Sequence, residues 1–116
     1  MAHLFGALLR ELRETADLSM GALARHLGVS VPYLSDVERG HRPPLVDEKI
    51  HRAAAVLRVD PAGLLKAAGE TRGAFQLDVA NVSGRALEVG AMLARQWPAM
   101  SEKKLERLQQ VLDEEG

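Results

Sequence analysis

One local pattern recurs five times along this chain and marks where its helices begin. An apolar residue precedes a Ser or Asp, and a leucine follows four positions after the Ser or Asp. At a helix start the polar side chain accepts a hydrogen bond from an unpaired backbone N–H, and the two apolar residues pack on each other. The pattern occurs at Ser19, Ser30, Asp60, Ser83 and Ser101. It predicts a succession of short helices and a largely all-α chain.

The periodicity of the apolar residues between these caps gives the approximate bounds of seven helices. They cover residues 4–15, 19–27, 30–39, 47–57, 60–68, 83–97 and 101–114. Gly28 and Gly40 fall where a left-handed backbone ends a helix, and Pro43 and Pro44 prevent the third helix from continuing.

The five helices of the first part are followed by a change of pattern. "GETRG", residues 69–73, has the composition of a linker. In "AFQLDV" the apolar residues Phe75, Leu77 and Val79 alternate, which predicts a short strand. A single strand needs a partner, and the sequence offers no second clear strand. We therefore expect a domain over residues 1–70 and a second segment, a strand and a helical hairpin, over residues 71–116.

The composition excludes several classes of protein. The chain has no cysteine, which removes disulfides and thiolate metal sites and fits a reducing cytoplasm. Its four histidines lack metal-ligand spacing, and no glycine-rich phosphate loop or catalytic triad can be assembled from the sequence. We expect no enzyme activity, no metal and no cofactor.

The charge pattern bears on location and partners. Charged residues interrupt the apolar N-terminal stretch, and no apolar run approaches the ~18 residues of a membrane span, so we expect neither a signal peptide nor a membrane partner. The net charge of −1 suits a nucleic-acid binder only if its basic residues gather on one face.

The stretch "LARHLGVSVPYLSDVERG", residues 23–40, joins two helices so tightly that they must cross. Leu23, Leu27, Val29, Leu34 and Val37 are apolar where the two helices meet, and Ala24 is small enough for a close approach. The rest of the second helix is polar or exposed. A helix supported on one side and polar on the other suits the DNA major groove, which admits one α-helix.

These residues carry a resemblance. With "LARHLGVS", "YLSDVERG", "RPP" and "LRVDPAGLL", residues 4–68 resemble the helix-turn-helix domain of the Cro/phage-repressor (XRE) family. The resemblance implies five helices, of which the second and third form the motif, and a DNA-binding transcriptional regulator. Arg58 stands where the family often has glycine.

The resemblance also implies roles for individual residues. Residues 30–39 would form the recognition helix, and Arg13 and Glu38 match an ion pair that ties the first helix to the third. The implied DNA contacts are Ser30, Val31, Pro32, Tyr33, Ser35, Asp36, Arg39, His41 and Arg42.

The base preference cannot be transferred, because the family's glutamine readers are absent. Tyr33 suits thymine methyl groups and Asp36 a cytosine amino group. The alternatives are local packing for Tyr33, a solvated carboxylate for Asp36 and a free surface arginine at Arg42.

A single helix-turn-helix reads a short site, and a dimer doubles it. The segment over residues 71–116 is the candidate for dimerisation across a two-fold axis. Its candidate interface residues are Phe75, Leu77, Val79, Leu87, Leu93, Trp97, Leu105, Leu108 and Leu112. The alternative is an intrachain helical hairpin that caps the first domain.

The sequence thus predicts a homodimeric repressor that reads a palindromic operator in double-stranded DNA through residues 30–39. It would be cytoplasmic, bacterial or phage-encoded, and associated with the nucleoid. Two alternatives remain. One is an antitoxin-type or protease-controlled repressor, whose C-terminal segment binds a toxin or a protease. The other is a protein-interaction adaptor that uses the fold without reading DNA.

Overall fold

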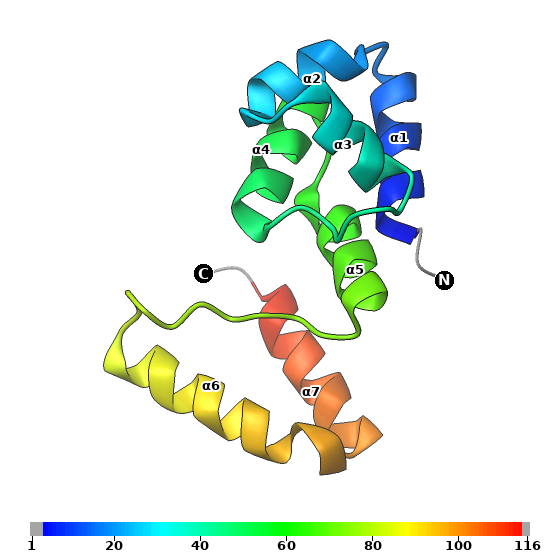
Figure 1. Cartoon of the computed structure of the whole chain (residues 1–116). Helices are drawn as coiled ribbons and strands as arrows, with labels where there is room; N and C mark the ends of the chain where they lie inside the picture. Colours follow the sequence, from blue (N-terminus) through cyan, green and yellow to red (C-terminus); the bar gives the residue numbers. More distant parts are fainter. Residues whose placement is uncertain (1–3, 115–116) are drawn as a thin grey trace. The chain divides into compact units, whose positions relative to one another are not determined.

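The structure is a computed structural model that describes residues 4–114 (Figure 1). These residues form seven α-helices and one 3-10 turn, with no strand among them. The elements are α1 (Leu4–Thr15), α2 (Met20–Leu27), α3 (Val31–Glu38), α4 (Asp47–Leu57), α5 (Pro61–Arg72), α6 (Gly84–Gln96), η1 (Trp97–Ala99) and α7 (Glu102–Asp113). The chain divides into two compact units, Met1–Phe75 and Gln76–Gly116.

All five predicted helix starts are confirmed. The side chains of Ser19, Ser30, Asp60, Ser83 and Ser101 each accept a hydrogen bond from a backbone N–H in the first turn of the helix that follows. The donor–acceptor distances are 3.1 Å at the four serines and 2.8 Å at the aspartate. Among α2 to α5, only α4 has an apolar residue, Val46, at its cap position, where no side chain accepts a hydrogen bond from the first turn.

The first unit packs its five helices around one apolar core. α1 packs against α3 and α5, while α4 packs against α2 and α5. The core residues are leucine, valine, isoleucine and alanine with one phenylalanine: Phe5, Leu9, Leu23, Ala24, Leu27, Leu34, Val37, Leu45, Ile50, Ala53, Ala54, Leu57, Leu64, Ala67 and Ala68. The predicted contacts between α2 and α3 are therefore part of this core.

The contact of α1 with the end of α3 depends on a glycine. A Cβ atom at Gly6 would lie closer than 3.0 Å to the carbonyl oxygens of Val37 and Glu38. Backbone atoms cannot move aside as a flexible side chain can. Glycine at this position therefore lets the two helices approach backbone to backbone.

An ion pair joins the same two helices. Arg13 of α1 donates from Nε to Glu38 Oε2 at 2.8 Å and from Nη2 to Glu38 Oε1 at 3.1 Å. The side chains of Arg13 and Glu38 are only 12% and 2% exposed. The hydrogen bond to Glu38 raises the pKa of Arg13 above its ordinary value.

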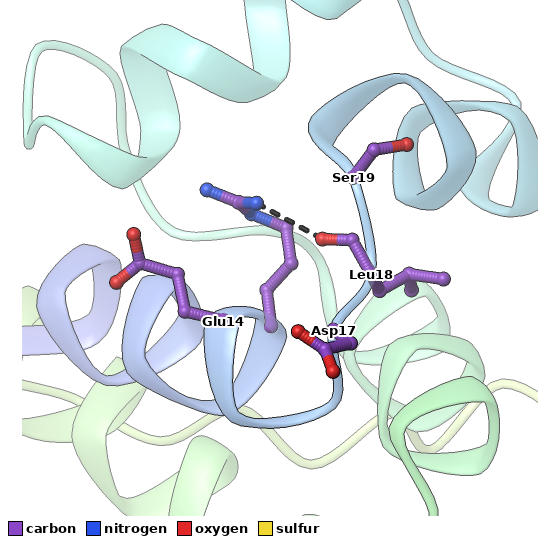
Figure 2. A pocket seen from close by; sticks show the side chains of 5 residues that line it. Glu14, Asp17, Leu18 and Ser19 are labelled. Carbon is purple, nitrogen blue, oxygen red and sulfur yellow. Dashed lines mark hydrogen bonds between the residues drawn. The ribbon is translucent and has the colours of Figure 1, made fainter.

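Arg13 also holds the turn between α1 and α2. Its Nη1 donates to the backbone oxygen of Leu18 at 3.0 Å, the bond drawn as a dashed line in Figure 2. The shallow, open depression at this corner is lined by Arg13, Glu14, Asp17, Leu18 and Ser19. Arg13 and Ser19 are already engaged within the fold, so the depression is part of the scaffold rather than a binding site.

The predicted linker over residues 69–73 is wrong, because α5 continues to Arg72. Thr71 Oγ1 accepts a hydrogen bond from the backbone N of Phe5 at 3.2 Å. The Arg72 guanidinium donates to the backbone oxygens of Pro44 and Leu45. The polar residues of the last turn are thus anchored to distant parts of the first unit, and these partners extend the helix by one turn.

The predicted strand at Phe75–Val79 is also wrong. Residues 74–79 have no regular secondary structure. The alternating pattern has no partner strand in the described chain, so its backbone groups have nothing to pair with. The side chain of Asp78 instead accepts a hydrogen bond from the backbone N of Ala80 at 2.9 Å, which forms a turn.

The second unit consists of two helices that meet at η1. Lys104 Nζ donates to Gln96 Oε1 at 2.6 Å near this corner. In Figure 1 α6 and α7 run apart from the corner. None of the described residues in α6, η1 and α7 is buried. The described residues of the second unit therefore form helices but no buried apolar core.

Over residues 4–114, every helix is too short or too polar to cross a membrane.

Two non-glycine residues of the first unit, Asp17 and Arg58, have a positive φ. Arg58 ends α4 in the left-handed conformation, with φ 59° and ψ 44°. An L-residue pays about 1 kcal/mol for this conformation, whereas glycine adopts it freely. We expect Arg58→Gly to increase the free energy of unfolding by up to about 1 kcal/mol and to raise the melting temperature by a few degrees. Arg58→Ala is the control, because it removes the side chain and keeps the strain. A glycine variant that melts no higher than the alanine variant would contradict the prediction.

The buried ion pair gives a second prediction. Removing one partner of a buried pair leaves an uncompensated charge, which costs about 3–5 kcal/mol. We expect Arg13→Ala to lower the unfolding free energy by about that amount, as measured by urea denaturation. Arg10→Ala is the control, because Arg10 lies on the same helix and forms an exposed pair with Glu14. The double variant Arg13→Met/Glu38→Leu should recover most of the loss. Equal unfolding free energies of Arg13→Ala and Arg10→Ala would show that the buried pair does not stabilise the fold.

Candidate nucleic-acid interface

The turn between α2 and α3 sets the crossing of the two helices. Gly28 adopts the left-handed conformation with φ 70° and ends α2, as the sequence predicts. The backbone N of Val29 then donates to the carbonyl oxygen of Ala24 at 3.0 Å, and Ser30 caps α3. Leu34 and Val37 bury one side of α3 in the core. The opposite side of the helix is left to the surface.

The structure places the implied DNA contacts on α3, at its cap and in the loop that follows. Ser30, Val31 and Pro32 at the start of α3 are exposed. Further along, Tyr33, Ser35 and Asp36 are half-buried, and Tyr33 also packs against the apolar core. The residues beyond the helix, Arg39, His41 and Arg42, are exposed.

The loop after α3 folds back on the helix. Gly40 has φ 79°, and its backbone N donates to the carbonyl oxygen of Val37 at 3.1 Å. The backbone N of His41 donates to the carbonyl oxygen of Asp36 at 2.8 Å. These two bonds are the Schellman arrangement, in which a left-handed residue closes the helix and reverses the chain.

The reversal brings Arg42 next to two residues of α3. The Arg42 guanidinium lies over the Tyr33 ring, 5.5 Å from its centroid, and Arg42 Nε is 3.9 Å from Asp36 Oδ2. The Arg42 and Asp36 side chains are 55% and 41% exposed, so the pair is weak. Three of the implied contact residues thus form one surface cluster. The sequence predicted the left-handed backbone at Gly40 but did not indicate which side chains it brings together.

Sequence reasoning missed one residue that supports this loop. Arg72, at the end of α5, donates to the backbone oxygens of Pro44 and Leu45, and its Nη1 lies 3.5 Å from Asp47 Oδ1. Its partners are at least 25 positions away in the sequence, so no local pattern pointed to them. The end of the segment between α3 and α4 is therefore anchored to α5 through Arg72.

The described residues include no cluster that would hold a metal. No group of three or more His, Cys, Asp or Glu side chains in residues 4–114 is arranged for it. In the same range, no buried side-chain nitrogen or oxygen lacks a hydrogen-bond partner.

Comparison with known proteins identifies relatives of the first unit. A family model described as a helix-turn-helix domain matches residues 4–67. An uncharacterized HTH-type transcriptional regulator of Mycobacterium tuberculosis (strain H37Rv) is 48% identical over 64 residues, which are 55% of this chain and 45% of that protein. The uncharacterized HTH-type transcriptional regulator RghRB of Bacillus subtilis (strain 168) is 37% identical over 79 residues, 68% of this chain and 56% of that protein. The aligned part of the chain spans about half the length of these relatives.

A solved structure shares the fold. The chain matches a chain of the SinR protein/SinI protein complex with a TM-score of 0.50 and 24% sequence identity, covering 93% of each chain. The family model covers more than half of the chain and coincides with the helices that build the core and present α3. The chain therefore belongs to the XRE-like helix-turn-helix family of DNA-binding transcriptional regulators, which are not enzymes.

Proposed function

We propose that this protein is a homodimeric, sequence-specific repressor that reads a palindromic operator through α3 and acts on the bacterial nucleoid in the cytoplasm. The observation that carries the proposal is the position of α3, which is buried on one side and presents Ser30–Pro32 and the Arg42 cluster on the surface. Repression follows by occlusion when two such helices occupy promoter DNA.

The first turn of α3 supplies the base contacts. Its exposed residues are small or apolar, so the helix can enter the major groove closely. The exposed Val31 suits a thymine methyl group. In the next turn of α3, the Asp36 carboxylate suits a cytosine amino group.

The loop after α3 supplies the phosphate contacts. Arg39, His41 and Arg42 are exposed beyond the helix, and contacts of this kind fix the register of a protein on the duplex. Asp36 offsets part of the charge of Arg42, and the whole chain carries a net charge of −1. Few unopposed cations imply weak non-specific binding, so discrimination between sites depends mainly on the base contacts.

The second unit supports the dimer. Leu87, Val89, Met92, Trp97, Val111 and Leu112 are all exposed, with Leu112 at 82%. Soluble monomers rarely keep such a surface open to water, and a second copy related by a two-fold axis would cover it with the same residues. Leu93, Leu105 and Leu108, which are half-buried, would join the interface from the same two helices.

The residues of the predicted strand have different roles in the proposal. Leu77 and Val79 are exposed and remain candidates for the dimer interface, without strand pairing. Phe75 belongs to the first unit.

A second candidate function uses the same exposed helices for another protein. The neighbouring solved structure is a complex of the SinR protein with the SinI protein. In this alternative a protein partner, such as an antagonist, a toxin or a protease, binds α6 and α7 and controls repression. An adaptor that does not bind DNA is the third possibility, and the DNA experiment separates it from the other two.

Selection of duplexes from a random DNA library with the full-length protein tests the proposal. We expect a palindromic consensus whose half-site centres lie about one helical turn, ~10 base pairs, apart. No enrichment over the starting library would exclude DNA reading and favour the adaptor.

The selected duplex then tests the loop. We expect Arg42→Ala to weaken binding to this duplex and to random DNA alike, and to lower the slope of log affinity against log salt by about one. Arg52→Ala is the control, because Arg52 is an exposed arginine of α4 that pairs with Glu48. An unchanged slope in Arg42→Ala would place the phosphate contacts elsewhere.

Truncation after Phe75 tests the dimer. The core residues of the first unit all lie between Phe5 and Ala68, so we expect the truncated chain to fold and to sediment as a monomer, while the full-length protein sediments as a dimer. The truncated chain should bind the palindrome at least tenfold more weakly, because the tether that raises the effective concentration at the second half-site is lost.

The intrachain alternative predicts a different result. If the second unit caps the first, truncation exposes apolar surface, and the truncated chain melts early or aggregates. A full-length protein that remains monomeric at tens of micromolar would rule out the dimer.

A further inference from the structure

The chain reverses its direction directly after α5. Gly73 ends the helix in the left-handed conformation with φ 77°. The backbone N atoms of Gly73 and Ala74 both donate to the carbonyl oxygen of Gly69, at 2.8 and 3.1 Å. Such a helix end turns the following residue back toward the last turn of the helix.

Phe75 completes the reversal. A Cβ atom at Gly69 would lie closer than 3.0 Å to three atoms of the Phe75 ring. The ring therefore occupies the space that any other residue at position 69 would fill. Phe75 is 66% exposed, so the contact adds little to the core and mainly fixes where the chain leaves α5.

The last turn of α5 is itself immobilised on the first unit. Thr71 binds the backbone of Phe5, and Arg72 binds the backbone before α4. With Phe75 seated on Gly69, the chain is attached to the first unit up to residue 75. The division into compact units falls at the same point, between Phe75 and Gln76.

The chain is attached to the second unit shortly afterwards. Asp78 and Ala80 form the turn described above, and a Cβ atom at Gly90 of α6 would lie 3.8 Å from Val79 Cγ1. Only Gln76 and Leu77 separate the contact at Phe75 from this turn. The connection between the units is therefore short, and releasing Phe75 would lengthen it by one residue.

We propose that the contact between Phe75 and Gly69, here called the latch, determines which half-site spacings the dimer accepts. The inference rests on the proposed dimeric function. Because the latch fixes the start of the short connection, it limits how far each α3-bearing unit reaches from the dimerisation unit. Gly69 and Phe75 are thus specificity-determining residues that do not touch DNA.

The size of the effect follows from chain geometry. One released residue adds about 3.5 Å of reach per protomer, or about 7 Å in a dimer. One base pair adds about 3.4 Å along the duplex and rotates the half-site by about 35°. Release of the latch would therefore admit spacings altered by about one or two base pairs.

Selection from a random duplex library with four full-length proteins tests the inference: the wild type, Gly69→Ala, Phe75→Ala and Gly63→Ala. Gly63→Ala is the matched control, because Gly63 also lies in α5 and a Cβ atom there meets nothing within 4 Å. We expect the wild type and Gly63→Ala to select one spacing. Gly69→Ala and Phe75→Ala should select the same half-site sequence over a range broadened by one or more base pairs. A thermal melt of each protein checks that it is folded.

The other outcomes overturn the inference in distinguishable ways. Paired half-sites with one spacing in all four proteins would show that the latch does not set the spacing, and would leave the proposed function intact. A broad range already in the wild type, or broadening in Gly69→Ala without Phe75→Ala, would show that the Phe75 ring does not set the spacing. Isolated half-sites in every protein would overturn the dimer and the latch together.

Discussion

The ion pair between the buried carboxylate of Glu38 and Arg13 is the interaction on which the rest of the first unit depends. Glu38 stands at the end of α3 with its side chain 2% exposed, where an unpaired charge would cost several kcal/mol. Arg13 satisfies both carboxylate oxygens and in the same place holds the turn after α1 through Leu18. Gly6 allows α1 to approach closely enough for this geometry. The C-terminal end of α3 is thereby fixed by a bidentate bond and a backbone contact, while Leu34 and Val37 hold its middle.

This support separates the residues that hold α3 from those that it presents. Ser30 is shared, because it caps the helix and also lies at the surface. Val31, Pro32 and Arg42 contribute nothing to the core, so the sequence at these positions is free to serve recognition. Arg42 nevertheless lies over the Tyr33 ring and near Asp36, and Arg72 anchors the loop beyond it. In the proposed interface, an Arg42 side chain already packed on Tyr33 would lose less conformational freedom on binding a phosphate than a free side chain.

The sequence predicted the features that depend on neighbours a few positions apart. The five caps, the left-handed Gly28 and the bounds of α1 and α4 all follow from local chemistry. The Arg13–Glu38 pairing came from the resemblance to a family, since 25 positions separate the two residues.

The two wrong predictions, the linker over residues 69–73 and the strand at Phe75–Val79, arose where partners distant in the sequence determine the local structure. Thr71 and Arg72 look like linker residues until Phe5 and the loop before α4 are placed beside them. The alternation of Phe75, Leu77 and Val79 resembles a strand, but a strand needs a second one, and Phe75 instead packs on Gly69.

The difference between the two units follows from the same distinction. α6 and α7 have the same serine caps as α2 and α3, so local signals specify helices equally well in both units. In the first unit the apolar faces meet each other and exclude water, whereas none of the described residues of α6 or α7 is buried. Helices of about 12 residues are marginal in water without packing. The caps alone therefore do not account for the second unit, whose stability requires apolar surface from outside the single chain or from elsewhere in it. In the proposed dimer a second copy supplies this surface, so dimerisation would be a condition of the folding of the second unit as well as of operator binding.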